Sequence, residues 1–344
     1  MNKTHVLAAV QMASGPNVDA NLLEAERLIG EAARAGAGLV VLPENFAFMG
    51  KRIQDVIPLA EADGEGPLQG FLSRTAAKYA VWLVGGTLPL AARDGGHADN
   101  AGAIAGEAAR DGGRASDSRD GGGRAASGTA ADNAGAIAGE AARDGGYVGN
   151  GSAAAGTLPL SLVRPPDRVR AACLVYDDRG DRVARYDKIH LFDVSVPGAE
   201  ERYEESSAIE PGDATRVIDS PFGRLGIAIC YDLRFPEQFR QMLDDGMELV
   251  AIPAAFTAIT GKAHWEPLVR ARAIENLIYV AAAAQGGYHI NGRETHGHSM
   301  IVDPWGTILG EVPRGTGFVC GPMDAGYLRS VRRSFPAIGH RRLK

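Results

Sequence analysis

Apolar and polar residues follow two different periods along this chain. Short runs rich in Val, Ile, Leu and Ala have the length of buried β-strands, and other segments place apolar residues at helical spacing. The pattern predicts strands within 5–12, 38–44, 80–87, 171–177, 182–191, 223–230, 247–256, 277–285, 297–312 and 317–324. It predicts helices at 17–37, 236–246 and 262–276. Strands that alternate with amphipathic helices indicate an α/β protein in which helices cover a sheet.

Residues 91–160 interrupt this pattern. They hold 17 Gly and 21 Ala but one aromatic residue, and the stretch "ADNAGAIAGEAARDGG" occurs at 98–113 and again at 131–146. A solenoid would need an apolar face on every repeat, and each copy offers a single isoleucine. We therefore interpret the segment as a disordered insertion in a surface loop between two strands. The prediction is one domain, 1–344, interrupted by this insertion.

Composition and charge narrow the class of protein. The chain has 344 residues, is 45% hydrophobic and carries a net charge of −6, with a pI of about 5.8. A nucleic-acid-binding protein would usually carry a basic face, so this balance argues against that class. No apolar run is long enough to span a membrane, and the start, "MNKTHVLAAVQM", predicts a strand rather than a secretion signal. We expect a cytoplasmic protein.

Three of the predicted strands end on residues with reactive side chains. "GLVVLPE" ends on Glu44, "RVARYDKIH" delivers Lys188, and "GIAIC" ends on Cys230. In α/β folds, functional sites gather at the carboxyl ends of strands. A cysteine between such a strand and the helix that follows it is exposed and close to several backbone N–H groups, as a nucleophile needs. Taken singly, each residue also fits an ordinary role as a cap, a surface base or a core thiol. The three together indicate a catalytic site with a cysteine nucleophile.

The segments around these residues resemble the carbon–nitrogen hydrolase, or nitrilase, superfamily. The motifs are "LPENF", "YDKIHLFD" and "GIAICYDLRFPE", and the resemblance covers the chain outside the insertion. It implies a four-layer α-β-β-α sandwich, a catalytic triad of Glu44, Lys188 and Cys230, and a homodimer or larger assembly. It also implies a second glutamate after the lysine strand, for which Glu205 fits the family pattern and Glu204 is the alternative.

This set of residues suits the hydrolysis of an amide bond. A cysteine sulfur attacks an amide carbon readily, and Glu44 would take the thiol proton and later activate water. The ammonium group of Lys188 and the backbone N–H of Tyr231 would stabilise the oxyanion, while Glu205 would position Lys188 or the substrate. The chemistry needs no metal or organic cofactor. The prediction is a cysteine-dependent amidase that releases ammonia or an amine.

The residues around the nucleophile distinguish branches of the superfamily. Nitrilases proper carry Cys-Trp-Glu, whereas this chain has Cys-Tyr-Asp followed by "LRFPE", as the amidase branches do. The segments "RARAIE" and "VDPWGT" favour the Nit1-type branch, whose members hydrolyse deaminated glutathione. The alternatives are the Nit2-type ω-amidases, which act on α-ketoglutaramate and share "AHWE" and "GHS", and hydrolases of other small amides or N-carbamoyl compounds.

Two further residues are candidates for binding the substrate. Both substrates carry carboxylates, for which an arginine is a suitable partner, and Arg234 lies four residues past the nucleophile. An ion pair that holds the turn together would explain Arg234 equally well. His190 follows Lys188 by two residues and either lines the pocket or packs beside it.

Several histidines raise the alternative of a metallohydrolase. His296 and His298 are two residues apart, which suits one face of a strand, and His289 and His264 are candidates for further ligands. No third ligand follows with orderly spacing and no acidic cluster accompanies them, so we favour a site without metal. We expect His298 to hydrogen-bond the backbone instead.

The remaining alternatives concern other parts of the chain. A non-catalytic scaffold would have lost a triad residue, and all three are present. The basic segment 327–344 would suit a nucleic-acid or membrane arm, but its apolar residues favour an oligomer contact. Cys173 and Cys320 lie within apolar runs and are predicted to be core or near-core thiols, and Asp303–Gly306 is predicted to be a turn.

Overall fold

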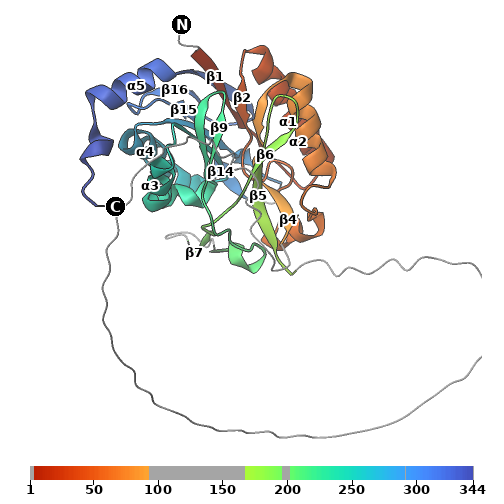
Figure 1. Cartoon of the computed structure of the whole chain (residues 1–344). Helices are drawn as coiled ribbons and strands as arrows, with labels where there is room; N and C mark the ends of the chain where they lie inside the picture. The colour runs from red at the N-terminus through yellow and green to blue at the C-terminus, as the bar shows by residue number, and fades with distance from the viewer. Residues whose placement is uncertain (1–3, 93–166, 196–201, 291, 344) are drawn as a thin grey trace, which may run out of the picture. The chain divides into compact units, whose positions relative to one another are not determined.

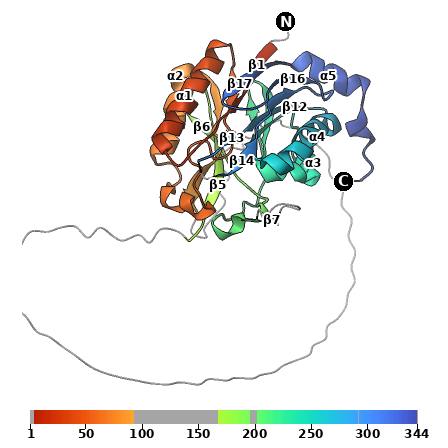
Figure 2. The ribbon, with the colours of Figure 1, turned by 180° about the vertical axis from the view of Figure 1, so that it is seen from behind.

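Two mixed β-sheets, with helices on both outer sides, form the described part of the protein (Figure 1, Figure 2). The computed structural model describes residues 4–92, 167–195, 202–290 and 292–343. Most of the segment 91–160 lies outside the described residues, so its interpretation as a disordered insertion stays a prediction.

The first sheet has seven strands in the order β17-β1-β2-β3-β5-β4, with β6 also paired to β5. Strands β1, β2 and β3 run parallel, and the other neighbours pair antiparallel. The bounds are β1 Thr4–Gln11, β2 Leu39–Val41, β3 Trp82–Val84, β4 Leu88–Ala91, β5 Val169–Tyr176, β6 Arg182–Asp187 and β17 Gly317–Asp324. Parallel strands at the centre of a sheet are buried on both faces, which explains their continuous apolar runs.

The second sheet has six strands in the order β16-β15-β12-β11-β10-β9, and its central strands β10, β11 and β12 are again parallel. The bounds are β9 Arg216–Ser220, β10 Gly223–Ile227, β11 Leu249–Ala254, β12 Tyr279–Ala284, β15 Ser299–Val302 and β16 Ile308–Val312. Two short antiparallel pairs stand apart from both sheets: β7 Asp193–Ser195 with β8 Arg202–Glu204, and β13 Gly286–Tyr288 with β14 Glu294–His296.

Alternate residues of the central strands face different layers. In β1, Leu7 and Ala9 belong to the core between the sheets, while Ala8 and Val10 belong to the core beneath the outer helices. The first sheet is covered by α1 Val18–Arg34 and α2 Pro67–Tyr79, the second by α3 Pro236–Asp244 and α4 Ala258–Asn276, and α5 Ala325–Ser334 follows β17. These four layers confirm the predicted α-β-β-α sandwich.

Local sequence sets where the helices begin. Asn17 caps α1, and Thr257 caps α4, because each side chain accepts a hydrogen bond from a backbone N–H in the first turn. The cap starts α4 at Ala258, ahead of the start predicted from apolar spacing. Pro236 is the first residue of α3, where its missing N–H removes no helical hydrogen bond.

The basic C-terminal segment forms α5 and docks on its own chain. Leu328 and Val331 are buried, and the guanidinium of Arg332 donates to the carbonyl oxygens of Met247 and Leu277. Part of the apolar surface that suggested an oligomer contact is therefore used within the chain. The predicted homo-oligomer stays a prediction.

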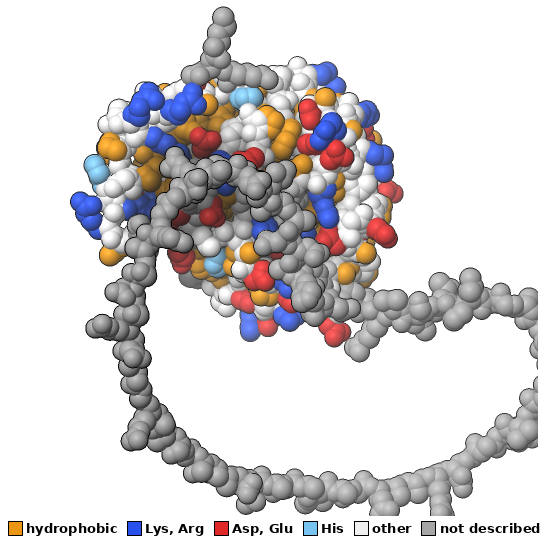
Figure 3. Space-filling model, in the orientation of Figure 1, with side chains coloured by type: hydrophobic (Ala, Val, Ile, Leu, Met, Phe, Trp, Pro, Cys, Tyr) orange, Lys and Arg blue, Asp and Glu red, His pale blue; other side chains and the backbone are white. Residues whose placement is uncertain are grey.

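The visible surface carries charges of both signs. Acidic and basic side chains are interspersed over the face in Figure 3, and Lys and Arg side chains gather over α5. Within the described ranges, no helix is both long enough and apolar enough to cross a membrane. The cytoplasmic location stays a prediction.

Two smaller predictions concern thiols and a turn. Cys173 is fully buried between the sheets, and Cys320 is partly buried against the core beneath α1, as expected for core or near-core thiols. The carboxylate of Asp303 accepts the backbone N–H groups of Trp305 and Thr307, which closes the predicted turn.

Candidate active site

Cys230 lies at a sharp bend between a strand and a helix. Strand β10 ends at Ile227, and Cys230 opens the 3-10 turn Cys230–Arg234 that leads into α3. Its φ of +47° is a left-handed conformation, which costs a residue with a side chain about 1–3 kcal/mol. The Sγ atom accepts the backbone N–H of Ala255 at 3.5 Å and lines a pocket. The strained bend thus presents the thiol to the pocket.

The buried ammonium group of Lys188 holds two carboxylates. Its Nζ donates to Oε1 of Glu44 at 2.8 Å and to the two carboxylate oxygens of Glu205 at 2.8 and 2.9 Å. Oε2 of Glu205 also accepts the backbone N–H of Phe192 at 2.7 Å, which fixes that carboxylate. Glu44 follows β2 and Lys188 follows β6, while the nucleophile follows β10. Three strand ends therefore meet at one cluster.

Burial and neighbouring charges shift the pKa values of this cluster. Burial by itself lowers the pKa of Lys188, but the charges of Glu205 and Glu44 outweigh it and raise that pKa well above its usual value. Burial raises the pKa of the Cys230 thiol well above its usual value, and the charge of Glu44 raises it further. Burial also raises the pKa of Glu205, against the opposing charge of Lys188. The free site therefore holds an ammonium group and a neutral thiol, and the thiol needs a base.

A further carboxylate, that of Asp232, stabilises the bend at Cys230 by hydrogen bonds. It is fully buried, and its Oδ2 accepts the backbone N–H of Ile229 at 2.8 Å and the hydroxyl of Tyr186 at 2.6 Å. Its Oδ1 accepts the backbone N–H of His190 at 3.0 Å and lies 2.7 Å from Nδ1 of the same residue. Tyr186 and His190 flank the lysine in sequence, and Ile229 precedes the nucleophile. Asp232 thus ties the segment of the ammonium group to that of the thiol.

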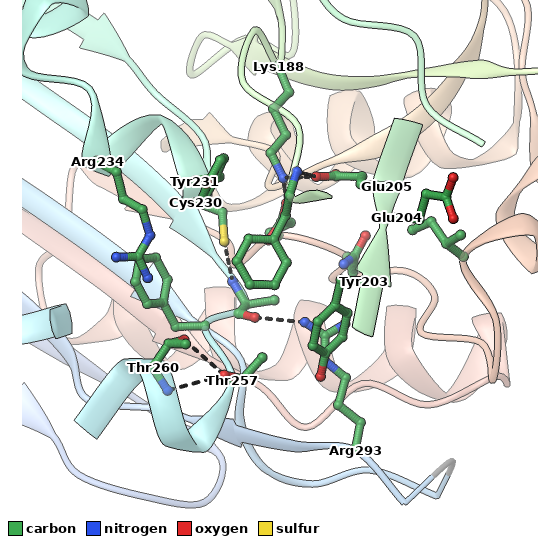
Figure 4. Close-up of a pocket in the computed structure, with 16 residues that line it drawn as sticks. Lys188, Tyr203, Glu204, Glu205, Cys230, Tyr231, Arg234, Thr257, Thr260 and Arg293 are labelled. Atoms are coloured by element: carbon green, nitrogen blue, oxygen red, sulfur yellow. Dashed lines mark hydrogen bonds and ion pairs between the residues drawn. The ribbon is translucent and has the colours of Figure 1, made fainter. Parts of the chain in front are cut away.

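The cluster faces one pocket of about 540 Å³ (Figure 4). Aromatic side chains line part of it, among them Phe192, Tyr231 and Phe256, and two guanidinium groups line another part, those of Arg234 and Arg293. The Cζ atom of Arg234 lies 5.1 Å from the ring centroid of Phe256 and 5.7 Å from that of Tyr231. Aromatic faces therefore support this cation at the pocket wall.

Residues 6–110 and 150–333 match the family model of the carbon-nitrogen hydrolases. The chain belongs to this family. The matched ranges contain the whole cluster around Lys188 and leave residues 111–149 between them. Membership of the family makes the chain a hydrolase of carbon–nitrogen bonds in amides, as its motifs predicted.

Relatives in the family extend over nearly the whole chain. A protein from Synechocystis is 35% identical over 98% of this chain and 98% of its own length, and one from Yersinia enterocolitica is 32% identical over 98% and 92%. Both are named deaminated glutathione amidase. The chain therefore aligns with these relatives as a whole and not through one motif.

Solved structures of family members share the fold. The Caenorhabditis elegans NitFhit protein is 30% identical with a TM-score of 0.71, and it covers 99% of this chain, which spans 66% of that longer protein. Nit3 from Saccharomyces cerevisiae, a member of branch 10 of the nitrilase superfamily, is 24% identical with a TM-score of 0.70, over 99% and 97% of the two chains. These likenesses agree with the sandwich described above.

Most of the predicted site residues of this family member meet at the pocket. Its lining includes Glu44, Lys188, Glu205, Cys230, Tyr231 and Arg234. Of the two alternatives for the second glutamate, Glu205 contacts the lysine. Glu204 lines the rim, with a side chain that is 62% exposed. The geometry therefore favours Glu205.

His190 differs from the prediction that it binds substrate. It lies outside the lining of the pocket, and its ring stacks on that of Phe235 with centroids 3.7 Å apart. Its Nδ1 faces Asp232 rather than the thiol. Of the two alternatives for His190, the structure favours packing beside the site.

The side chain of His298 pairs with a carboxylate, whereas the bonds of this residue to the backbone come from its own N–H, which donates to the carbonyl of Pro313. Its Nδ1 bonds to Glu311, and its ring stacks on that of His296 with centroids 4.2 Å apart. His289 instead bonds to the backbone of Ser14 and to the hydroxyl of Thr295. Among the residues that the structure describes, no three His, Cys, Asp or Glu side chains are grouped so as to hold a metal ion.

Sequence reasoning missed two parts of the site. Asp232 lies inside the nucleophile motif, and a carboxylate between the apolar residues Ile229 and Leu233 was a signal that it is buried and needs partners. Arg293 lies between β13 and β14, in a segment whose histidines were candidate metal ligands. Its place in the pocket depends on the fold, because no apolar strand precedes it.

Proposed function

We propose that this amidase hydrolyses deaminated glutathione with Cys230 as its nucleophile. Deaminated glutathione is a 2-oxo acid whose side-chain amide joins it to cysteinylglycine, so hydrolysis yields 2-oxoglutarate and cysteinylglycine. The observation that carries the chemistry is the meeting of a neutral thiol, the Glu44 carboxylate and the Lys188 ammonium group at one pocket. The substrate rests on the relatives of that name, which align over nearly the whole chain.

Glu44 acts as the base in the first half of the reaction. The thiol proton moves to its carboxylate as Sγ forms a bond with the amide carbon, because the raised pKa of the thiol leaves too little thiolate without a base. The lysine occupies Oε1 of Glu44, so Oε2 remains for this proton. When the carbon–nitrogen bond breaks, Glu44 passes the proton to the leaving nitrogen, and a thioester remains on Cys230.

Lys188 stabilises the oxyanion of the tetrahedral intermediates. An ammonium group has three N–H donors, and in the free site they bond to Oε1 of Glu44 and to both oxygens of Glu205, so one of the two that reach Glu205 turns to the substrate oxygen. The backbone N–H of Tyr231, next to the nucleophile, is the second donor. The raised pKa keeps the lysine charged throughout the cycle. Loss of one such donor typically lowers turnover by ~10²–10³-fold.

Water completes the reaction. Glu44 takes a proton from a water molecule as its oxygen attacks the thioester carbon, and the carbon–sulfur bond then breaks. The proton returns from Glu44 to the sulfur, which regenerates the neutral thiol. Glu205 holds the lysine in place during both halves, because its own carboxylate is fixed by the backbone of Phe192.

The test measures 2-oxoglutarate released by the purified protein from deaminated glutathione and from α-ketoglutaramate at equal concentration. Both substrates yield this product, so one coupled assay compares their kcat/KM values directly. We expect the higher value for deaminated glutathione and none for the Cys230→Ala variant. A higher value for α-ketoglutaramate would assign the chain to the ω-amidases. Activity confined to simple amides or N-carbamoyl compounds would refute both substrates.

A further inference from the structure

Two guanidinium groups reach the pocket from different parts of the chain. Arg234 belongs to the 3-10 turn of the nucleophile, and Arg293 to the segment between β13 and β14. In Figure 4, Arg234 lies with Thr257 and Thr260 on one side of Cys230, and Arg293 lies on the other. The pocket thus carries a cation on either side of the reacting sulfur.

These arginines are the cations with which the pocket can bind substrate carboxylates. Of the described residues that line it, three are cationic: Lys188, Arg234 and Arg293. The three N–H groups of Lys188 already bond to Glu44 and to both oxygens of Glu205, and the oxyanion takes one of them, so none is left for a substrate carboxylate. Deaminated glutathione has two carboxylates, one on the 2-oxo acid and one on the glycine at the far end of the leaving group. A substrate with an anion on each side of the scissile bond matches the two arginines.

Arg293 lies at a distance that suits the far carboxylate. Ala255 joins it to the nucleophile, because the backbone N–H of Ala255 contacts Sγ at 3.5 Å and its carbonyl accepts Nη2 of Arg293 at 3.0 Å. The N and O atoms of Ala255 are separated by the width of one residue, so the two contacts together place Nη2 of Arg293 within about 10 Å of Sγ of Cys230. The two residues of cysteinylglycine span at most about 7 Å, and a hydrogen bond from the guanidinium to the carboxylate covers about 3 Å more. The glycine carboxylate can therefore reach this guanidinium.

The neighbours of Arg293 place it on the side of the leaving group. Its Cζ atom lies 5.2 Å from the ring centroid of Tyr203, which precedes Glu205 by two residues. Glu205 shares the ammonium group of Lys188 with Glu44. Since Glu44 must protonate the leaving nitrogen, the leaving group departs along the wall that carries these residues. Arg234, on the other side, is left for the carboxylate of the 2-oxo acid.

We infer that Arg293 binds the carboxylate of the leaving group and so selects deaminated glutathione over α-ketoglutaramate. This inference rests on the proposed function. In α-ketoglutaramate the leaving group is ammonia, which carries no carboxylate, so its hydrolysis does not use this contact. The residue is a specificity determinant, because it touches the substrate remote from the reacting atoms.

The experiment pairs a change in the enzyme with the matching change in the substrate. Arg293→Gln should lower kcat/KM for deaminated glutathione by about 10–100-fold, which is the loss expected for one charge-assisted hydrogen-bonding partner. The kcat/KM for α-ketoglutaramate should stay within about twofold of the wild-type value. The second substrate is deaminated glutathione with a carboxamide in place of the glycine carboxylate. The wild-type enzyme should lose a similar factor in kcat/KM on this analogue, which keeps only the carboxylate of the 2-oxo acid, and Arg293→Gln should reduce kcat/KM on it little further.

The control variant is Arg314→Gln, which removes the same charge outside the lining of the pocket, from a side chain that is 49% exposed and pairs with Glu294. This variant should retain the wild-type ratio of kcat/KM for deaminated glutathione to kcat/KM for α-ketoglutaramate. Arg293→Lys, which retains the charge, should recover part of that ratio. Thermal unfolding of each variant checks that it is folded, and the wild-type measurement with the carboxamide decides the question without any variant.

Three results would overturn the inference. Equal losses on deaminated glutathione and α-ketoglutaramate would place Arg293 at the 2-oxo acid or in the fold. Equal wild-type rates on the carboxylate and the carboxamide would show that the far carboxylate is not bound, while the proposed function would stand. Wild-type preference for α-ketoglutaramate would refute the proposed function, and this inference with it.

Discussion

Replacing Asp232 with asparagine tests whether the carboxylate behind the nucleophile sets the catalytic geometry. Each carboxylate oxygen faces two donors, with a backbone N–H in each pair, that of Ile229 for Oδ2 and that of His190 for Oδ1. Asparagine keeps one oxygen and replaces the other with an NH₂ group. Whichever way the amide turns, one of these backbone N–H groups meets a donor instead of an acceptor.

The expected loss follows from that mismatch. A buried donor left without an acceptor costs about 1–3 kcal/mol, and hydrogen bonds to a charged group contribute about 1.5–3 kcal/mol. Part of this is recovered because the hydroxyl of Tyr186 or the ring of His190 can accept from the new NH₂ group. We therefore expect Asp232→Asn to lower the free energy of unfolding by about 3 kcal/mol. A shift of the bend by about 1 Å would lower kcat by about 10²-fold.

Urea unfolding and steady-state kinetics separate the two effects. We expect kcat to fall while KM changes little, because Asp232 lies outside the lining of the pocket and does not meet the substrate. The matched control is Asp303→Asn, which weakens two backbone hydrogen bonds in a turn outside the pocket lining and should lower stability but not kcat. Wild-type kcat in a destabilised Asp232→Asn variant would refute the positioning role, and wild-type stability would refute the hydrogen-bond analysis.

Three further predictions concern other parts of the chain. Cys230→Ala should lower kcat by more than about 10⁴-fold without loss of the folded state in circular dichroism, and retained turnover would exclude this nucleophile. Deleting 91–160 should leave kcat within about threefold, because surface loops tolerate changes of length, whereas aggregation would contradict the interpretation as a loop insertion. Burial and the charge of His298 lower the pKa of His296 from 6.5 to about 4. The unfolded chain therefore binds the extra proton between pH 6.5 and 4, and stability that is complete above pH 6.5 falls across that window. Allowing for screening of this half-exposed ring, we expect a loss of about 1–2 kcal/mol, which His296→Gln should remove in pH-dependent urea unfolding.

The sequence predicts the parts of the site that depend on local order. Glu44, Lys188 and Cys230 each follow a run of apolar residues, and the direction of such a run decides at which edge of a sheet it ends. The strand boundaries were less accurate, because β6 ends at Asp187 and β10 at Ile227, before the residues that the apolar pattern had included. Both strands end earlier than predicted for the same reason, because the chain leaves the sheet where it turns the reactive side chain towards the pocket.

The parts that the sequence did not predict depend on contacts between distant segments. Asp232 meets Tyr186 across 46 positions, and this contact fixes His190 beside the site rather than in the pocket. Arg293 reaches the site through a hydrogen bond to Ala255, 38 positions away. Period and composition carry no information about such pairs: the position of Asp232 among apolar residues indicates that it is buried but not which residues it contacts.

The distribution of charge separates the chemistry of this site from its specificity. Two carboxylates share one ammonium group beside the thiol, an arrangement that keeps Lys188 charged but gives the cluster an excess of negative charge. At an effective dielectric constant of about 20, one excess charge repels a substrate carboxylate at about 8 Å by about 2 kcal/mol. The cations that can offset this repulsion are the other two in the described lining of the pocket, Arg234 and Arg293. Changes to the cluster should then lower kcat for every substrate, whereas a change to Arg234 should weaken binding of both 2-oxo acids and a change to Arg293 should alter the choice between them.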